Sequence, residues 1–281
     1  MLHAPLGLSS ADLKAIADLE ARTVAVDGGR LKLEWGSLRS RSGERVEDLL
    51  WWDGDRLLGF LGLYSFGAPT VELAGMVDPT ARRRGIGTAL LDAARPLCLE
   101  RGYHPMLLVI PHDTPGAAAF AEHHHGTLDH SEHAMVLSGE PADDPPGPNV
   151  RLRAANDTDL GRMRELLADG FGYAPDETDL RLDTDTARTM MVDVDGVTVG
   201  TIRLTDEGGA GGIYGFVVDG ARRGEGIGRA ALRQACLMLR MRGASSVGLE
   251  VAVENEHALG LYTSIGFTRV TTEDYYALPL T

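Results

Sequence analysis

Lysine, cysteine and long apolar runs are scarce in this chain of 281 residues. Lys14 and Lys32 are the only lysines among 27 basic residues, and we draw no functional conclusion from that bias. The only cysteines, Cys98 and Cys236, each lie in an apolar helical pattern, so we expect two buried free thiols in a reducing compartment. No segment approaches the roughly 18 apolar residues that span a membrane, and the N-terminus lacks a signal-peptide pattern. We therefore expect a cytoplasmic protein that has no membrane partner.

The chain has too few basic residues for general nucleic-acid binding. It carries 27 basic and 41 acidic residues, a formal net charge of −14, and its 43% hydrophobic and 24% charged residues are typical of globular proteins. Because a nucleic acid needs a basic surface, we expect no nucleic-acid partner. A small anionic ligand needs only a local basic cluster, and two such clusters are present.

The clusters belong to an internal repeat. Residues 82–87, RRRGIG, align with residues 223–228, RGEGIG, at an offset of 141, and a Val-Asp pair, a glycine and a leucine keep the same offset. An offset this long indicates two whole domains rather than a solenoid. Residues 140–149 contain four prolines and three acidic residues, a composition typical of a linker. We predict an N-terminal domain at 1–139, a linker at 140–149 and a C-terminal domain at 150–281.

Both halves follow one order of elements: strand, helix, three strands, helix, strand, helix and closing strands. Helices are expected near residues 11–25 and 85–101 in the first half, and from 157 and over 226–242 in the second. Gly54-Asp55 and Asp195-Gly196 are two-residue hairpin signals. A strand pair over 268–271 and 275–278 closes the chain. This layout predicts an α+β fold (α/β, mixed sheet) in which each domain has a mixed, mostly antiparallel sheet flanked by helices.

The basic clusters sit where a strand enters a glycine-rich turn that opens a helix. Residues 216–229, FVVDGARRGEGIGR, place three arginines around that turn. A helix N-terminus leaves backbone N–H groups unpaired and carries partial positive charge, and glycine lets this backbone approach an anion. The pattern therefore predicts a phosphate cradle. The chain has no Gly-Lys-Ser/Thr triplet, and neither turn completes G-x-G-x-x-G.

The remaining pattern, Arg-x-x-Gly-x-Gly after a strand, resembles the acyl-CoA pyrophosphate loop of the GNAT superfamily (GCN5-related N-acetyltransferases). Residues 249–267, LEVAVENEHALGLYTSIGF, are similar to the next segment of that family. The resemblance implies acetyl-CoA as co-substrate, a splayed pair of strands that admits its pantetheine, a pantetheine contact from Asn255, and Tyr262 as the acid that protonates the thiolate. It also implies a backbone N–H near Val218 that polarises the thioester carbonyl.

The same resemblance implies a set of acetyl-CoA-binding residues in each half. In the second half these are Phe216, Val217, Val218, Arg223, Gly224, Glu225, Gly226, Ile227, Gly228, Arg229 and Asn255. In the first half they are Met76, Val77, Arg82, Arg83, Arg84, Gly85, Ile86, Gly87 and Thr88.

The first half has a degenerate second block. Phe120 stands where the tyrosine is expected, and either Asp113 or Thr114 stands near the place of Asn255. Because phenylalanine cannot donate a proton, we predict that the N-terminal domain holds acetyl-CoA at most and does not turn it over. Its five histidines at 123–125, 130 and 133 lack the spacing of metal ligands, and we predict a solvated helix end and no metal.

The general base is the open part of the mechanism. Related enzymes often place a glutamate on the strand before the loop, where this chain has Gly211 and Gly212. Glu250 on the neighbouring strand, or Tyr214 through a water, could remove the amine proton instead. The first half has Glu72 on its corresponding strand. An acidic run at residues 176–185 indicates either an acceptor loop or a solvated face.

We predict an N-acetyltransferase that moves acetyl from acetyl-CoA to a primary amine of a small molecule or peptide, as a monomer or homodimer. Among tandem members the layout is similar to the mycothiol synthase family, which implies cysteinyl-glucosaminyl-inositol as one candidate acceptor. The alternative from another class is a non-catalytic acyl-CoA-binding or scaffold protein. The intact block at Asn255, Tyr262 and 266–267 argues against that alternative.

Overall fold

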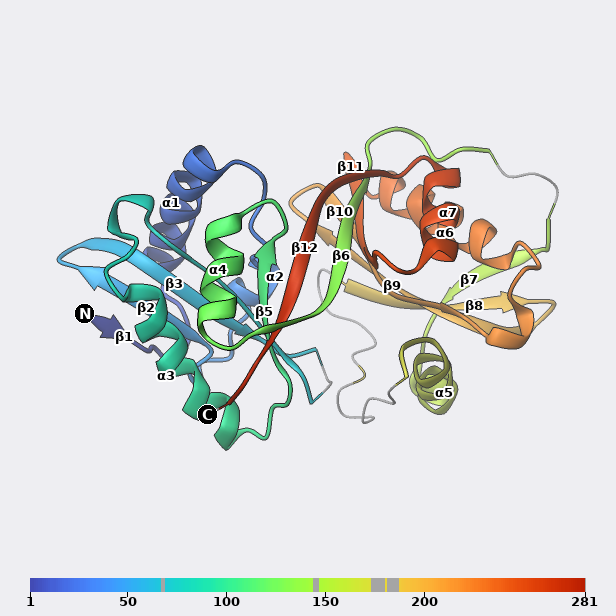
Figure 1. Ribbon diagram of the computed structural model, residues 1–281. Coiled ribbons are helices and arrows are strands. Elements are labelled where there is room, and N and C mark those ends of the chain that lie inside the picture. Colours follow the sequence, from blue (N-terminus) through green and yellow to red (C-terminus); the bar gives the residue numbers. More distant parts are fainter. Residues whose placement is uncertain (67–68, 144–146, 173–179, 181–186, 281) are drawn as a thin grey trace. The chain divides into compact units, whose positions relative to one another are not determined.

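The computed structural model describes residues 1–66, 69–143, 147–172, 180 and 187–280. The chain divides into two compact units, one made of residues 1–131 and 271–281 and the other of residues 132–270 (Figure 1). No helix among the described residues has the length and apolarity needed to cross a membrane.

The first unit has a mixed, mostly antiparallel sheet. Its strand order is β1-β2-β3-β4-β5-β12, in which β4 and β5 pair in parallel and the other neighbouring strands pair antiparallel. The strands are β1 (Leu2–His3), β2 (Asp48–Asp53), β3 (Arg56–Tyr64), β4 (Val71–Val77), β5 (Met106–Pro111) and the C-terminal part of β12 (Thr268–Leu278). The helices are α1 (Ser10–Asp27), α2 (Trp35–Arg39), α3 (Ile86–Glu100) and α4 (Pro115–His123).

The second unit repeats this plan. Its strand order is β6-β11-β10-β9-β8-β7, and β10 and β11 form the parallel pair. The strands are the C-terminal part of β6 (Thr127–Leu137), β7 (Val150–Ala154), β8 (Ala187–Val194), β9 (Val197–Glu207), β10 (Ala210–Val218) and β11 (Ser246–Ala252). The helices are α5 (Leu160–Phe171), α6 (Ile227–Met241) and α7 (Glu256–Ile265).

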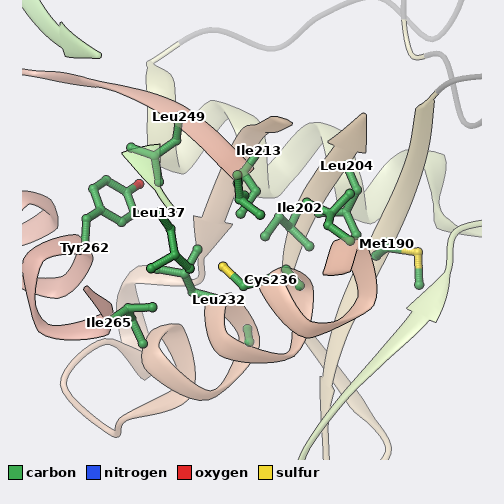
Figure 2. Packing of buried hydrophobic residues seen from close by; sticks show 14 of the residues in the cluster. Leu137, Met190, Ile202, Leu204, Ile213, Leu232, Cys236, Leu249, Tyr262 and Ile265 are labelled. Carbon is green, nitrogen blue, oxygen red and sulfur yellow. The ribbon is translucent and has the colours of Figure 1, made fainter. Parts of the chain in front are cut away.

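Helices cover both faces of each sheet. In the first unit α3 and α4 pack on one apolar face and α1 and α2 on the other, and in the second unit α6 and α7 pack opposite α5. Figure 2 shows the core between α6, α7 and the sheet of the second unit. Cys98 and Cys236 are fully buried in these cores, as predicted, and burial raises the pKa of their thiols to about 11 and about 12.

The local signals predicted most elements. Asn156 caps the turn before α5 through a 3.0 Å hydrogen bond from the Thr158 N–H. Both hairpins form, and Asp195 and Gly196 have φ of 50° and 81°, the left-handed pair that a tight two-residue turn requires.

Two predictions about the chain end and the domain limits differ from the structure. Residues 268–278 form the single strand β12 rather than two paired strands. The unit boundaries fall inside β6 and β12, so residues 132–139 belong to the second unit and 271–281 to the first. The compact units therefore differ from the predicted 1–139 and 150–281, because the strand that ends each repeat pairs with the sheet of the other repeat: β6 with β11, and β12 with β5.

Candidate functional site

The parallel strands part in both units, as the sequence resemblance implies. In the second unit β10 and β11 pair over three positions, from Ala210/Ser246 to Gly212/Gly248, although β10 continues to Val218. In the first unit β4 and β5 pair from Val71/Met106 to Leu73/Leu108. Beyond these pairs the two strands of each unit are not paired with each other, and the opening between them can receive an extended ligand.

A β-bulge distinguishes the opening of the second unit. The register of β10 against β9 shifts between Tyr214 and Val217, and Gly215 has φ of +53°. Strand β4 pairs with β3 without a shift. Because a bulge adds one residue, it re-aims the side chains on one side of it. The two repeats therefore align at an offset of 141 after the bulge but 140 before it.

The glycine-rich turn and the start of α6 have an open backbone. Gly224 and Gly226 have φ of +83° and +82°, and a Cβ at Gly224 would meet nothing within 4 Å. The first hydrogen bond of α6 runs from the Ala230 N–H to the Gly226 carbonyl at 3.1 Å, so the N–H groups of 227–229 precede the helical ladder. An anion can approach this open backbone closely, which fits a pyrophosphate.

The first unit has the same turn, but with a non-glycine residue at one left-handed position. Gly85 has φ of +80°, but the residue matching Gly224 is Arg83, which has φ of +60°. A side chain in the left-handed region costs about 1–2 kcal/mol, so this turn is strained where its counterpart is not.

The first arginine of each turn braces the strand that precedes it. Arg223 Nε donates to the Val218 carbonyl at 3.0 Å and its Nη2 lies 2.8 Å from Asp169. Arg82 makes the matching bonds to the Val77 carbonyl at 3.2 Å and to Asp27 at 2.8 Å. Sequence reasoning missed both acids, although the signal existed: each lies near the end of the first helix of its repeat.

Not every loop charge in the second unit is available to a ligand. Arg222 holds Glu225 through three hydrogen bonds of 2.8–3.0 Å, which lower the pKa of that carboxyl. Arg229 donates to Ser264 Oγ and to the Asp143 carbonyl. These arginine side chains already have partners within the protein, whereas the N–H groups at the start of α6 precede the helical ladder.

Asn255 and Tyr262 lie on α7 as the sequence predicts. Asn255 caps the helix, and its side-chain oxygen accepts from the Ala258 N–H at 3.1 Å, which leaves its NH₂ group as the donor for a ligand. Tyr262 lies in the core beside Leu249 and is 9% exposed (Figure 2). Burial raises the pKa of this phenol to about 12, so it holds its proton at neutral pH, as an acid must.

The prediction that Phe120 stands at the place of Tyr262 in the first unit is wrong. The Phe267 N–H donates to the Tyr262 carbonyl, and the matching bond runs from the Gly126 N–H to the Ala121 carbonyl. Ala121, not Phe120, is therefore the counterpart. Phe120 matches Leu261 instead, and each of them packs over the last glycine of its motif, Gly87 or Gly228. The first unit still has no phenol at this place. Thr114 caps α4 without a side-chain hydrogen bond.

The two units differ at the strand position where related enzymes often have a glutamate. With the bulge included, Gly212 matches Glu72, and Tyr214 matches Ala74. A Cβ at Gly212 would lie 2.4 Å from Thr205 Oγ1 and 2.7 Å from the Tyr214 ring. The Tyr214 ring thus fills the space that a carboxylate side chain at 212 would need.

Glu250 lies across the opening from Tyr214. Each residue is two positions beyond the last parallel pair, Gly212/Gly248, and on the face opposite α6 and α7. Tyr214 is 46% exposed and Glu250 is half-buried. The structure therefore brings both candidate bases to the rim of one opening.

The histidines do not converge. Among the described residues no group of three or more His, Cys, Asp or Glu side chains could hold a metal ion. His124 is buried, contacts Thr88 at 3.2 Å and packs on Phe120. Most of the acidic run at 176–185 lies outside the described residues, as do 144–146 of the predicted linker.

Two splayed parallel pairs, each followed by a left-handed turn at a helix N-terminus, define an acyl-CoA-dependent acyltransferase fold present twice. The chain belongs to the Acetyltransferase (GNAT) family, whose model matches residues 20–126 and 160–267. It is an N-acetyltransferase of the acetyl-CoA-dependent class, which confirms the predicted family, fold and enzyme class.

Relatives match nearly the whole chain. A mycothiol acetyltransferase of Kytococcus sedentarius is 30% identical over 99% of this chain and 98% of its own, and one of Thermobispora bispora is 32% identical over 94% and 95%. The fold is similar to a GCN5-related N-acetyltransferase from Sphaerobacter thermophilus, with a TM-score of 0.79, 21% identity and coverage of 100% and 95%. It is also similar to a tandem GNAT protein from the clavulanic acid biosynthesis pathway, with a TM-score of 0.72, 20% identity and coverage of 100% and 99%.

Proposed function

We propose that the second unit acetylates the primary amine of cysteinyl-glucosaminyl-inositol, as a mycothiol synthase does. The near full-length similarity to proteins named mycothiol acetyltransferase supports this acceptor. The single structural observation that carries the assignment to the second unit is Tyr262, a buried protonated phenol where the first unit has Ala121.

Backbone groups of the second unit bind acetyl-CoA and polarise its acyl carbonyl. The backbone N–H groups at 224–229 bind the pyrophosphate of acetyl-CoA, and the edges of β10 at Phe216, Val217 and Val218 bind the extended pantetheine. Acetyl-CoA supplies the activated acyl group. A backbone N–H near Val218 polarises the acyl carbonyl, and preformed backbone donors are effective at this task.

Two proton transfers complete the mechanism. Tyr262 donates its phenol proton to the departing thiolate. Either Tyr214, through a water, or Glu250 accepts a proton from the substrate ammonium, since both lie at the rim of the opening. A base of this kind is needed because only the neutral amine attacks a thioester.

The first unit holds acetyl-CoA at its 82–88 turn at most and does not transfer the acetyl group. It has a carboxylate, Glu72, but Ala121 at the place of Tyr262, whereas the second unit has Tyr262 and has Gly212 in place of the carboxylate.

The test is an acetyl-transfer assay that follows coenzyme A by chromatography, since this acceptor carries a thiol of its own. We expect transfer to cysteinyl-glucosaminyl-inositol and to its S-methyl derivative, and none to polyamines, aminoglycosides or N-terminal peptides. Activity on another amine class alone would refute the acceptor. Acetyl-CoA binding without transfer to any of these amines would favour a non-catalytic acyl-CoA-binding protein.

A further inference from the structure

Lys32 is buried in the first unit, which is unusual for a lysine. Its side chain is 7% exposed, and lysine is almost never buried unless it is paired. The chain's other lysine, Lys14, is 75% exposed on α1 and pairs with Asp18 at its surface. Lys32 therefore owes its position to specific partners.

Those partners lie at the opening between β4 and β5. The Lys32 ammonium lies 3.3 Å from a carboxylate oxygen of Glu72 on β4 and donates to the Tyr275 hydroxyl on β12. The ammonium lies 5.0 Å from the centre of the Tyr275 ring, on the side of its hydroxyl. A carboxylate and a phenol hydroxyl together form a recognition site for a primary ammonium.

The segment that carries Lys32 also closes the opening. This segment lines a cavity of about 10 Å³ through Leu31, Lys32 and Leu33. The other lining residues are Ala74 and Gly75 of β4, Val109 to Pro111 of β5, and Glu273. That volume is about enough for one water molecule. Arg30, next in the segment, pairs with the buried Glu273 at 3.3 Å and fixes the segment from its other end.

Glu72, the carboxylate of this ion pair, lies beside the opening of the first unit. In strand register Glu72 matches Gly212, on the strand before the turn, beside the opening between the parallel strands. Lys32 thus brings a primary amine, the chemical group that the family acetylates, to the carboxylate at that opening.

We propose that the first unit has an amine-binding site that its own Lys32 occupies, so that this unit is closed to an external amine. The site takes a primary alkylammonium, and Lys32 is its covalently attached ligand. This inference rests on the family assignment and not on the acceptor proposed above. Its tests use neither acetyl-CoA nor that acceptor, so the two proposals fail separately.

The first test measures how fast each lysine reacts with acetic anhydride, followed by peptide mass spectrometry. The chain has only two lysines, so Lys14 is the matched internal control. We expect Lys32 to react at least about tenfold more slowly than Lys14, since its reaction requires local opening. Glu72→Gln should accelerate the reaction of Lys32 and leave that of Lys14 unchanged. Equal rates for both lysines in the wild-type protein would overturn the proposal.

The second test vacates the site. Lys32→Ala removes the equivalent of n-propylammonium, so this variant should unfold several degrees below the wild type and recover part of that loss when n-propylammonium is added, because a ligand that binds only the folded state stabilises it. Tetramethylammonium, which cannot donate a hydrogen bond, should give no recovery. Lys14→Ala should respond to neither ion.

Lys32→Met keeps the test decisive if Lys32→Ala does not fold. Methionine retains the side-chain volume but removes the ammonium, so we expect a lower unfolding temperature that n-propylammonium does not restore. A Lys32→Met protein as stable as the wild type, or equal effects of the two ammonium ions on Lys32→Ala, would refute an ammonium-specific site.

Discussion

Substitution of Gly226 separates the anion-binding role of the turn from its role in folding. Gly226 has φ of +82°, and a Cβ placed there would lie 3.5 Å from Pro148 Cδ, an ordinary contact. Any other residue therefore pays mainly for the left-handed backbone, about 1–2 kcal/mol. We expect Gly226→Gln and Gly226→Glu to lower the free energy of unfolding by about that amount.

The two variants should differ sharply in their affinity for acetyl-CoA. They have the same size and backbone cost, but only glutamate brings a negative charge to the pyrophosphate. Two like charges 4–6 Å apart repel by about 3–4 kcal/mol at an effective dielectric constant of about 20, and salt reduces this further. We therefore expect Gly226→Glu to bind acetyl-CoA about 30- to 1000-fold more weakly than Gly226→Gln.

Calorimetric titration with acetyl-CoA and urea unfolding measure the two quantities. The helix dipole makes the result more discriminating, because a glutamate at a helix N-terminus is favourable for folding by about 0.3–1 kcal/mol. The Glu variant should thus be at least as stable as the Gln variant while it binds more weakly. Equal affinities would refute the assignment of this turn to the pyrophosphate. The same pair at Gly85 reports whether the first unit binds acetyl-CoA.

Three further predictions concern proton transfer and pH. Tyr262→Phe should lower kcat about 10²-fold with little change in acetyl-CoA affinity; Tyr276→Phe, an equally buried phenol, is the control, and an unchanged kcat for Tyr262→Phe would remove it as the acid. Either Tyr214→Phe or Glu250→Gln should abolish the acidic limb of the pH profile of kcat/KM, and that variant identifies the base. If both pH profiles match the wild type, neither residue is the base. Burial, followed by nearby His123 and Arg95, lowers the pKa of His124, so its neutral form stabilises the fold above about pH 6.5 and that contribution disappears as the pH falls through the folded-state pKa. His124→Gln should flatten the urea-unfolding stability between about pH 7 and pH 5, and an unchanged slope would contradict the reasoning.

The sequence was most informative where structure is set by neighbouring residues. Gly85, Gly224 and Gly226 indicate left-handed turns that open a helix, and Asp195-Gly196 indicates a tight hairpin, because each depends on the backbone preferences of a few consecutive residues. The repeat itself came from the same local patterns, since both turns recur at one offset. Asn255 and Tyr262 likewise share one short helix, so their spacing alone places them together.

Local sequence patterns did not predict which strands pair. No local feature of β12 shows that its last residues pair with β5 of the first unit, or that β6 ends in the second. Likewise the bulge at Tyr214 to Val217 shifts the repeat register by one, which decides that Gly212, and not Ile213, matches Glu72.

The sequence by itself therefore determined the family, the two glycine-rich turns and the phenol of the second unit. Only the tertiary structure decided that the Tyr214 ring covers Gly212 and that Lys32 lies against Glu72, 40 positions away in the chain. The physical reason is that a turn or helix cap is formed by residues a few positions apart, whereas an ion pair across a sheet opening depends on how distant segments pack. A buried lysine and an exposed one look alike in a sequence, and the carboxylate and the phenol beside Lys32 distinguish it from Lys14.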